Sequence, residues 1–548
     1  MRSQSILVAV AMATFVMSSC GSTRPARTEA EPVPRERHRT YPDSPQETVT
    51  ETMHGHTVPD PYRWLEEDAA PRVVAWTAAQ NAFTAAHLAR SEDRQQLECS
   101  LEEAFEVGSL GTPTVAGGRA FWTERRADQN QTRLMTRLVD GNEAPRVLID
   151  GDALSKDGTI AIDWFYPSPS GRLLAYGLSE SGNEASVLHV LDVQTGHALP
   201  TRIPGTRFAS LAWSPDEGGF FYTRYPLAGT RYWAEVGEDD ARYNRHVYWH
   251  RLGTDHTQDL RIFGDGMPRE DWPNVSAASD GKMVVITQHR GWSESKIFAR
   301  AWSAKPNAEW AVVADREGSR EHPLPTNEHL FVFTNHDAPR GRVLRISWKN
   351  LDVNKAEEII PSDPTRVMEG VQVIGGLLAV HWLHEASSQL ELFDHDGKLV
   401  RSVALPTLGS VTGMGGERRR GDLFYGFSSY VTAPVVYRAS PKVTEGQADI
   451  VFEHIPGAVD PDDFVVALHR TSSKDGTPLT LFVVHRRDLV PDGDEPTVLY
   501  GYGGFNIALT PSYIRNIQPF LAAGGVYAVA HLRGGGEYGE AWHKAGML

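Results

Sequence analysis

The middle of the chain repeats a pattern about every 47 residues, and this repeat limits the folds that the chain can adopt. Four of the six intervals between neighbouring apolar runs are 46 or 47 residues long, and most runs are followed roughly thirteen to fifteen residues later by a second alternating run. Turn signals such as Asp157-Gly158 and Asp280-Gly281 separate the runs. The runs start at Ala120, Leu173, Phe220, Met283, Leu330, Leu377 and Leu423.

This period of paired strands predicts a β-propeller. A helical solenoid would place apolar residues at a spacing of 3.6 residues, and the repeat has no long pattern of that kind. Each blade of a propeller is a small sheet that buries its two faces against its neighbours, which accounts for the apolar runs. Seven runs therefore predict seven blades over residues 106–448.

After about Pro441 the repeat ends and another pattern of strands begins. The apolar runs 464–469 and 479–484 flank Lys474-Asp475-Gly476-Thr477, which is a strong hairpin signal. Two further runs, 498–500 and 526–530, are each followed by a cluster of glycines. Short buried strands closed by glycine are typical of an α/β sheet, which places its chemistry at the strand ends. Residues 449–548 are predicted to begin such a domain.

Four stretches carry a family resemblance. They are YGYGGFN…TP at Tyr500 to Pro511, AVAHLRGGGEYGEAWHKAG at Ala528 to Gly546, DPYRWLEE at Asp60 to Glu67, and WTAAQN at Trp76 to Asn81. Together they resemble the prolyl oligopeptidase family of serine peptidases, and they are more similar to its proline-specific branch than to its dibasic-specific branch. The resemblance extends from about residue 45 to the last residue.

The resemblance implies a seven-bladed propeller inserted into an α/β-hydrolase domain that both chain ends form. Residues 46–105 would then be the N-terminal segment of the hydrolase domain, and residues 449–548 would be the start of its sheet. In the family, the second tyrosine of YGYGG donates its phenolic hydrogen to the oxyanion, and that position is Tyr502. The phenylalanine of GGF, which is Phe505, would line the pocket for the proline ring. From the residues alone, packing of Tyr502 in a tight glycine turn is the favoured interpretation, and only the family motif favours the oxyanion role.

The nucleophile is not visible in the sequence. The family's serine lies in a GGSNGG-type elbow with its aspartate and histidine further on, and no serine in this chain has glycine two positions before and after it. We therefore expect a peptidase cut short before its Ser/Asp/His triad and inactive by itself. The complete enzyme is expected to be a serine endopeptidase that cleaves short peptides after proline, with the propeller capping the active site. The alternative is a propeller-based binding protein or a non-catalytic remnant.

The composition of the chain limits the classes of partner that it is expected to bind. The formal net charge of −16 argues against nucleic acid, whose phosphates call for a basic surface. No cofactor is implied, and no metal site is expected because the nearest pattern, His381 to Glu385, fails the metalloprotease motif at Ser388. We expect short proline-containing peptides as partners and a monomeric chain.

The N-terminus resembles a bacterial export signal. Arg2 is followed by an apolar run at 6–16 that is too short to span a bilayer, and then by VMSSCGS, which resembles a lipobox with Cys20 as the lipidated residue. An ordinary signal peptide cut nearby, or an unprocessed tail, are the alternatives. Residues 1–20 would be the signal segment and residues 21–45, rich in Pro, Arg, Glu, Ser and Thr, a flexible tether. The expected location is the cell envelope, in the periplasm or anchored to the membrane through Cys20.

Overall fold

The computed structural model describes residues 41–230, 232–233, 242–278, 280–303, 308–417, 420–441 and 449–547. The predicted signal segment, Cys20 and most of the tether lie outside these residues. Two compact units are distinguished, one ending at Glu102 and the other beginning at Glu103.

The first unit contains a hairpin and a long helix. Its elements are β1 (Thr50–Met53), β2 (His56–Pro59), η1 (Arg63–Glu66), α1 (Pro71–Leu88) and the start of α2 (Arg94–Phe105). Trp64 is buried against Trp76, with their ring centroids 6.0 Å apart, and donates its indole N–H to the Pro45 carbonyl oxygen at 2.8 Å. The motif residues of DPYRWLEE and WTAAQN thus pack on one another. Among the helices of the described residues, none is both long and apolar enough to cross a bilayer.

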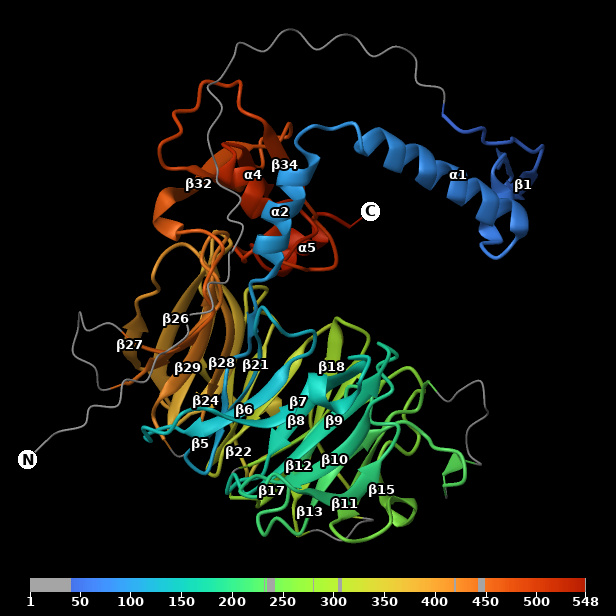
Figure 1. Cartoon of the computed structure of the whole chain (residues 1–548). Helices are drawn as coiled ribbons and strands as arrows, with labels where there is room; N and C mark the ends of the chain where they lie inside the picture. The colour runs from blue at the N-terminus through green and yellow to red at the C-terminus, as the bar shows by residue number, and fades with distance from the viewer. Residues whose placement is uncertain are drawn as a thin grey trace, which may run out of the picture. The chain divides into compact units, whose positions relative to one another are not determined.

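The second unit opens with the predicted propeller (Figure 1). Six four-stranded antiparallel sheets and one five-stranded sheet follow one another along the described chain and form seven blades. Each of the seven apolar runs lies in β5, β9, β13, β17, β21, β25 or β29, an inner strand of its blade that pairs with a strand on both sides. The fold class predicted from the repeat is therefore confirmed.

The blades are built as follows. Blade 1 contains β3 (Ser109–Leu110), β4 (Thr114–Ala116), β5 (Arg119–Arg125), β6 (Arg133–Leu138) and β7 (Arg146–Asp150), and the short helix α3 (Gly151–Leu154) follows it. Blade 2 contains β8 (Ile160–Pro167), β9 (Leu173–Glu180), β10 (Val187–Asp192) and β11 (Ala198–Ile203). Blade 3 contains β12 (Leu211–Trp213), β13 (Gly219–Arg224), β14 (His246–Arg251), η4 (His256–Gln258) and β15 (Leu260–Phe263). Blade 4 contains β16 (Trp272–Ala277), β17 (Met283–Arg290), β18 (Glu294–Ala301) and β19 (Ala311–Asp315).

The last three blades repeat this plan. Blade 5 contains β20 (Glu321–Pro325), β21 (His329–Thr334), β22 (Arg342–Ser347), η5 (Val353–Lys355) and β23 (Glu357–Ile360). Blade 6 contains β24 (Val367–Ile374), β25 (Leu377–His384), β26 (Ser387–Asp394) and β27 (Leu399–Val403). Blade 7 contains β28 (Ser410–Gly416), β29 (Leu423–Ser428), β30 (Val435–Ala439) and β31 (Ile450–His454).

The outer strand of every blade carries a register shift. The pairing between the third and the outermost strand is interrupted once in each of the seven sheets. A β-bulge increases the local right-handed twist, so its repetition at this position suits blades that fan out from a common axis. The first strands surround that axis, because residues of β4, β8, β12, β16, β24 and β28 line one cavity of about 460 Å³.

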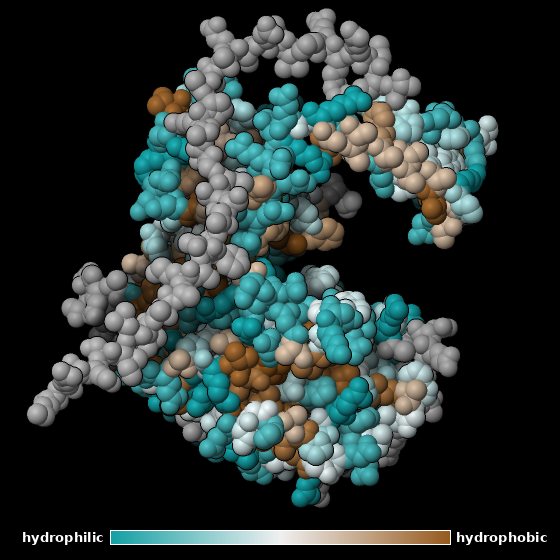
Figure 2. All heavy atoms as spheres, viewed as in Figure 1, coloured by the Kyte–Doolittle hydropathy of each residue, from teal (hydrophilic) through white to brown (hydrophobic). Residues whose placement is uncertain are grey.

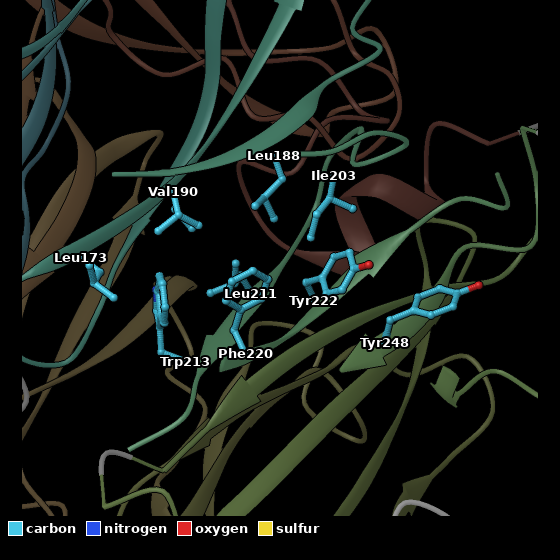
Figure 3. Close-up of a cluster of buried hydrophobic side chains, with 10 residues drawn as sticks. Leu173, Leu188, Val190, Ile203, Leu211, Trp213, Phe220, Tyr222 and Tyr248 are labelled. Atoms are coloured by element: carbon cyan, nitrogen blue, oxygen red, sulfur yellow. The ribbon is translucent and has the colours of Figure 1, made fainter. Parts of the chain in front are cut away.

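Apolar side chains hold neighbouring blades together. Between blades 2 and 3, Leu188 and Ile203 face Phe220 and Tyr222 across the interface (Figure 3). Figure 2 shows apolar residues gathered on the visible face of the propeller, in the region where Figure 1 labels β8 and β12. Burial of these large side chains is the main source of stability for a ring in which no described strand pairs with a strand of another blade.

Each blade consists of strands that are consecutive in the sequence, so no described strand is shared between the first and the last blade. The ring therefore closes between blades 7 and 1 through side chains. Phe424 and Phe452 of blade 7 pack with Trp122 of blade 1, with the Trp122 and Phe452 ring centroids 5.6 Å apart. Arg438 adds an ion pair to Asp140 at 2.8 Å. Apolar packing with a polar rim therefore completes the propeller.

The chain then enters a four-stranded mixed sheet. The order is β32 (Phe464–Ser472), β33 (Pro478–Arg486), β35 (Val526–Ala530) and β34 (Thr497–Gly501), with β34 and β35 parallel and the other pairs antiparallel. The short helix η6 (Pro461–Asp463) precedes the sheet, η7 (Arg515–Ile517) and α4 (Gln518–Ala522) connect β34 to β35, and α5 (Glu540–Lys544) follows β35. The predicted hairpin and both later strands are confirmed. β34 is one of the two edge strands of this sheet, and its Leu499 is 69% exposed.

Two propeller segments are embedded in this sheet. Ala386, at the tip of the β25–β26 hairpin, and Tyr430 and Val431, after β29, share one buried cluster with Phe482 and Tyr527 of the sheet. Glu385, next to Ala386, forms a bidentate ion pair with Arg470 of β32, with N–O distances of 2.9 and 2.6 Å. Propeller and sheet therefore share a hydrophobic core on the side of blades 6 and 7.

Candidate functional site

Two glycine-rich loops meet at one edge of the sheet. Because β34 and β35 are parallel, their carboxyl ends lie at the same edge, where the loops 502–509 and 531–539 begin. The backbone N–H of Asn506 donates to the Gly534 carbonyl oxygen at 3.1 Å. The N–H of Leu509 donates to the buried Glu537 carboxylate at 2.9 Å. The loops thus support each other.

Glycine is required where the loops touch. Gly503 and Gly534 have φ angles of 66° and 97°, in the region that favours glycine. A Cβ added to Gly534 would lie 2.2 Å from the Gly503 carbonyl oxygen, and one added to Gly503 would lie 2.7 Å from the Leu532 Cβ. Both values are below any real contact, so the two backbones approach as closely as they do only because these residues lack side chains.

The two residues predicted to contact substrate project from the first loop. Tyr502 directly follows β34, is 46% exposed, and its hydroxyl has no hydrogen-bond partner among the described residues. Phe505 is 82% exposed and has a φ of 53°, an unusual conformation for a bulky residue and one that the tight turn imposes. The structure brings both side chains to the carboxyl edge of the sheet, and their roles stay predictions.

Polar groups under the second loop hold it in place. His531 is fully buried, and its Nδ1 lies 2.7 Å from the Thr480 Oγ1 on β33. The same Thr480 hydroxyl contacts the Tyr538 hydroxyl. Burial lowers the pKa of His531 to about 4 and raises the pKa of Glu537. The loop therefore rests on a histidine that stays neutral in the folded protein at neutral pH.

The burial of His531 predicts acid lability. Its folded pKa of about 4 lies below the unfolded value of about 6.5, so between these pH values the unfolded chain binds a proton that the folded chain does not. Stability is therefore present above pH 6.5 and is lost as the pH falls toward 4. At pH 5 the loss relative to pH 8 is about 2 kcal/mol from this one group.

Urea denaturation of the wild type and of His531→Asn at pH 5 and at pH 8 measures this loss of stability. The pH-dependent part of the unfolding free energy should shrink in His531→Asn and stay unchanged in His197→Asn, which alters an exposed histidine. An equal pH dependence in wild type and His531→Asn would contradict the expectation.

The glycine loops lie against blades 5 and 6. The N–H of Glu540 donates to the Pro339 carbonyl oxygen at 2.9 Å, and a small cavity of about 100 Å³ separates the loops from the propeller. Its lining includes His322 of β20, Glu369 of β24, and Asn506 and Gly536 of the loops. The starts of β20 and β24 therefore mark the propeller face that carries the sheet.

A larger pocket at the same face was not found from the sequence. The first strands run in the same direction around the axis, so Trp272, the first residue of β16, lies at the same end as the starts of β20 and β24. The pocket measures about 450 Å³, and its walls include Phe208, Arg245, Trp272 and Trp292. These residues come from segments far apart in the sequence. The only local signal is the turn Gly291-Trp292, whose tryptophan is 90% exposed.

Metal ligands are not gathered in the described residues, where no group of three or more His, Cys, Asp or Glu side chains could hold an ion. His381, half of the nearest motif, instead places its Nε2 2.8 Å from the Ser388 Oγ. Burial lowers its pKa to about 4.

Comparison with known proteins agrees with this architecture. Residues 42–448 match the family described as prolyl oligopeptidase, N-terminal beta-propeller domain, and residues 511–548 match the prolyl oligopeptidase family. A prolyl endopeptidase of Elizabethkingia meningoseptica is 30% identical over 512 residues, which are 92% of this chain and 70% of that protein. Prolyl oligopeptidase A of Amanita bisporigera is 28% identical over 550 residues, 92% of this chain and 71% of its own length.

Solved structures of related proteins have the same overall fold as this chain. One from a study of two prolyl endopeptidases is 33% identical, with a TM-score of 0.82, and the match covers 93% of this chain and 74% of that one. Prolyl oligopeptidase B from Galerina marginata, at 23% identity and a TM-score of 0.82, shows the same fold. A seven-bladed propeller joined to an α/β sheet with paired glycine loops defines a propeller-bearing hydrolase. The chain belongs to the prolyl oligopeptidase family of serine peptidases.

Proposed function

We propose that the chain supplies the propeller and the oxyanion side of an endopeptidase that cleaves short peptides after proline. The observation that carries this proposal is the position of Tyr502. Its phenol stands half exposed at the carboxyl edge of β34, on a loop that Gly503 and Gly534 fix by direct backbone contact. A donor held before the reaction costs no reorganisation when negative charge develops on the carbonyl oxygen.

Phe505 supports the choice of proline. Its ring is exposed on the same loop, three residues from Tyr502. A pyrrolidine ring has no hydrogen-bond donor and offers a flat apolar face, so an aromatic wall suits it. In this proposal Phe505 contacts the proline ring while the Tyr502 hydroxyl faces the carbonyl oxygen of the same residue.

The nucleophile, general base and orienting acid are proposed to come from polypeptide that pairs with the open side of β34. Val498, Leu499 and Tyr500 leave this edge strand exposed and apolar, and a further parallel strand would cover them. The chain spans about 70% of the relatives it matches, which leaves room in a relative for that part of the sheet.

The test is hydrolysis of a chromogenic peptide with proline before the scissile bond. The 548-residue chain alone should release no chromophore, because attack on the carbonyl requires a serine activated by a histidine. The same residues joined to a Ser/Asp/His-bearing continuation should cleave the proline peptide and spare its alanine counterpart. Turnover by the 548-residue chain would contradict the proposed division of labour, and cleavage without proline preference would contradict the proposed specificity.

Attachment to the cell envelope through a lipidated Cys20 is part of the same proposal. The support is the order of charged, apolar and small residues before Cys20. Mass spectrometry of the N-terminal peptide from a membrane fraction tests it, since a diacylglycerol-modified cysteine at position 20 is expected. Cleavage elsewhere, with Cys20 unmodified, would remove the anchor.

A further inference from the structure

Three arginines line a cavity of about 510 Å³ between blades 1 and 2. Arg119 begins β5 and Arg146 begins β7 in blade 1, whereas Arg172 directly precedes β9 in blade 2. The first strand of a blade starts on the sheet side and the antiparallel second strand starts where the first one ends, so Arg119 and Arg172 lie at the propeller end away from the sheet. The cavity is therefore distinct from the glycine loops and from the pocket that Trp272 lines.

The strand pairing of blade 1 places Arg119 and Arg146 on the face that meets blade 2. Phe121 is paired with Thr136, and Thr136 is paired with Arg146, so these three residues share one face of the sheet. Arg119 lies two residues before Phe121 and therefore shares that face. Phe121 packs in the buried cluster that joins blade 1 to Tyr176 of blade 2. The cavity is thus the place where the apolar packing between the two blades ends and polar side chains begin.

Two of the three guanidinium groups have no carboxylate partner among the described residues. The half-buried Arg119 side chain forms neither an ion pair nor a hydrogen bond with any of them. Arg146 donates to the Val193 carbonyl oxygen, a neutral acceptor in blade 2. Only Arg172 has an acidic neighbour, the Glu217 carboxylate, which lies 3.6 Å from its Nε. The bond from Arg146 to blade 2 holds its guanidinium across the interface, where a ligand can reach the remaining N–H donors.

The lining of the cavity carries an excess of positive charge. Its one carboxylate belongs to the exposed Glu143, which forms no ion pair within the described part of the chain. Three guanidinium groups thus face one carboxylate, although the whole chain has a formal net charge of −16. Positive charges held around one cavity repel each other, and an anion bound between them would replace that repulsion by attraction.

The chemistry of the lining favours a phosphate group as the anion. The planar guanidinium fork binds two phosphate oxygens at once, and the Ser170 hydroxyl and the Gln194 side-chain amide add donors to the same wall. A phosphate monoester carries a charge of about −1.5 to −2 at pH 7, which several cations neutralise better than a single carboxylate would need. Among the described residues that line the cavity none is aromatic, so a nucleobase would find no ring to stack on.

We propose that this cavity binds a phosphate monoester or a pyrophosphate group on a compound that lacks an aromatic base, with Arg119 and Arg146 contacting the phosphate oxygens. The phosphate can belong to a soluble compound, such as glycerol 3-phosphate, or to the headgroup of a phospholipid, such as phosphatidic acid, because both present the same chemistry. The cavity lies away from the glycine loops, so the inference does not require the proposed cleavage.

Isothermal titration of the 548-residue chain with inorganic pyrophosphate and with glycerol 3-phosphate tests the proposal, and neutral glycerol is the control ligand. At least one of the two anions should bind, and glycerol should not. Arg119→Gln should weaken the binding of that anion about ten- to a hundredfold, since the loss of a hydrogen bond to a charged group has that effect. Arg202→Gln removes an exposed arginine of β11 that does not line the cavity and should bind the anion as the wild type does.

Vesicle flotation distinguishes the two sources of the phosphate. The chain is mixed with phosphatidylcholine vesicles that either contain or lack phosphatidic acid. A phospholipid headgroup is the ligand if phosphatidic acid increases the recovery of the wild type with the vesicles and Arg119→Gln abolishes that increase. A soluble phosphate compound is the ligand if only the titration responds to Arg119→Gln.

Three results would overturn the proposal. They are no binding of either anion or of phosphatidic acid vesicles, equal binding by the wild type and Arg119→Gln, and an equal loss of binding in Arg119→Gln and Arg202→Gln. If Arg119→Gln fails to fold, as circular dichroism would show, Gln194→Glu takes its place. This change adds a carboxylate to the cavity wall at an exposed position, so it should also weaken anion binding, and unchanged binding would refute the site.

Discussion

Replacing Tyr502 by phenylalanine is expected to lower kcat/KM for a proline peptide by roughly 100- to 1000-fold in a polypeptide that joins this chain to a Ser/Asp/His triad. The substitution removes one hydroxyl from a half-exposed ring and leaves the glycine contacts below it intact. Because the negative charge develops only during attack on the carbonyl and is absent from the bound substrate, the loss should fall on kcat while KM stays nearly constant.

The matched control is Tyr500→Phe. Tyr500 lies two residues earlier on β34 and is 47% exposed, compared with 46% for Tyr502. The Tyr500→Phe variant also loses one phenolic hydroxyl near the end of β34, so a general effect on folding would appear in both variants. A loss of activity in Tyr502→Phe no larger than that in Tyr500→Phe would show that the phenol is not an oxyanion donor.

Replacing Asp259 by alanine is expected to destabilise the propeller by about 2–5 kcal/mol, because it leaves the buried Tyr222 hydroxyl and His250 ring without the carboxylate that both contact. The Asp259 carboxylate accepts from the Tyr222 hydroxyl at 2.7 Å and lies 3.0 Å from the His250 Nδ1. Arg224, also buried, donates to the Tyr222 hydroxyl at 3.1 Å and stacks on Tyr248 at 4.0 Å. Tyr222 and Tyr248 belong to the cluster of Figure 3.

Urea denaturation followed by tryptophan fluorescence measures this loss. The control is Asp265→Ala, in which an aspartate whose side chain is 77% exposed loses its ion pair with Arg261. An exposed pair of this kind contributes about 0–1 kcal/mol. If the two variants shifted the denaturation midpoint equally, the blade 3 network would not carry the stability assigned to it.

The strands that the repeat located are those with two buried faces. β13 and β29 are buried along their whole length, and such strands give continuous apolar runs. The outermost strands were not located, because they are largely exposed. β27, with the sequence LVRSV, buries only Val403. A bulge also breaks the regular pairing of each outer strand, so strict alternation is lost where it would have marked the blade edge.

The candidate site was predictable only where one stretch of sequence carries it. Tyr502 and Phe505 lie within a single motif, and its glycines indicate a tight turn even without a structure. The pocket around Arg245 has no such stretch. Phe208, Trp272 and Trp292 come from the loop before β12, the start of β16 and the turn after β17, and only strand pairing within blade 4 and its packing on blade 3 bring them together.

The shared core at blades 6 and 7 has a practical consequence for dissecting the protein. The repeat suggests a cut near residue 449, yet Tyr430 packs on Phe482 at 5.7 Å and on Tyr527 at 5.9 Å across that boundary. The Tyr430 carbonyl oxygen also accepts from the Gln518 side chain at 2.8 Å. An isolated propeller would expose these rings to water and would self-associate. The propeller and the sheet should therefore be expressed together as a single polypeptide.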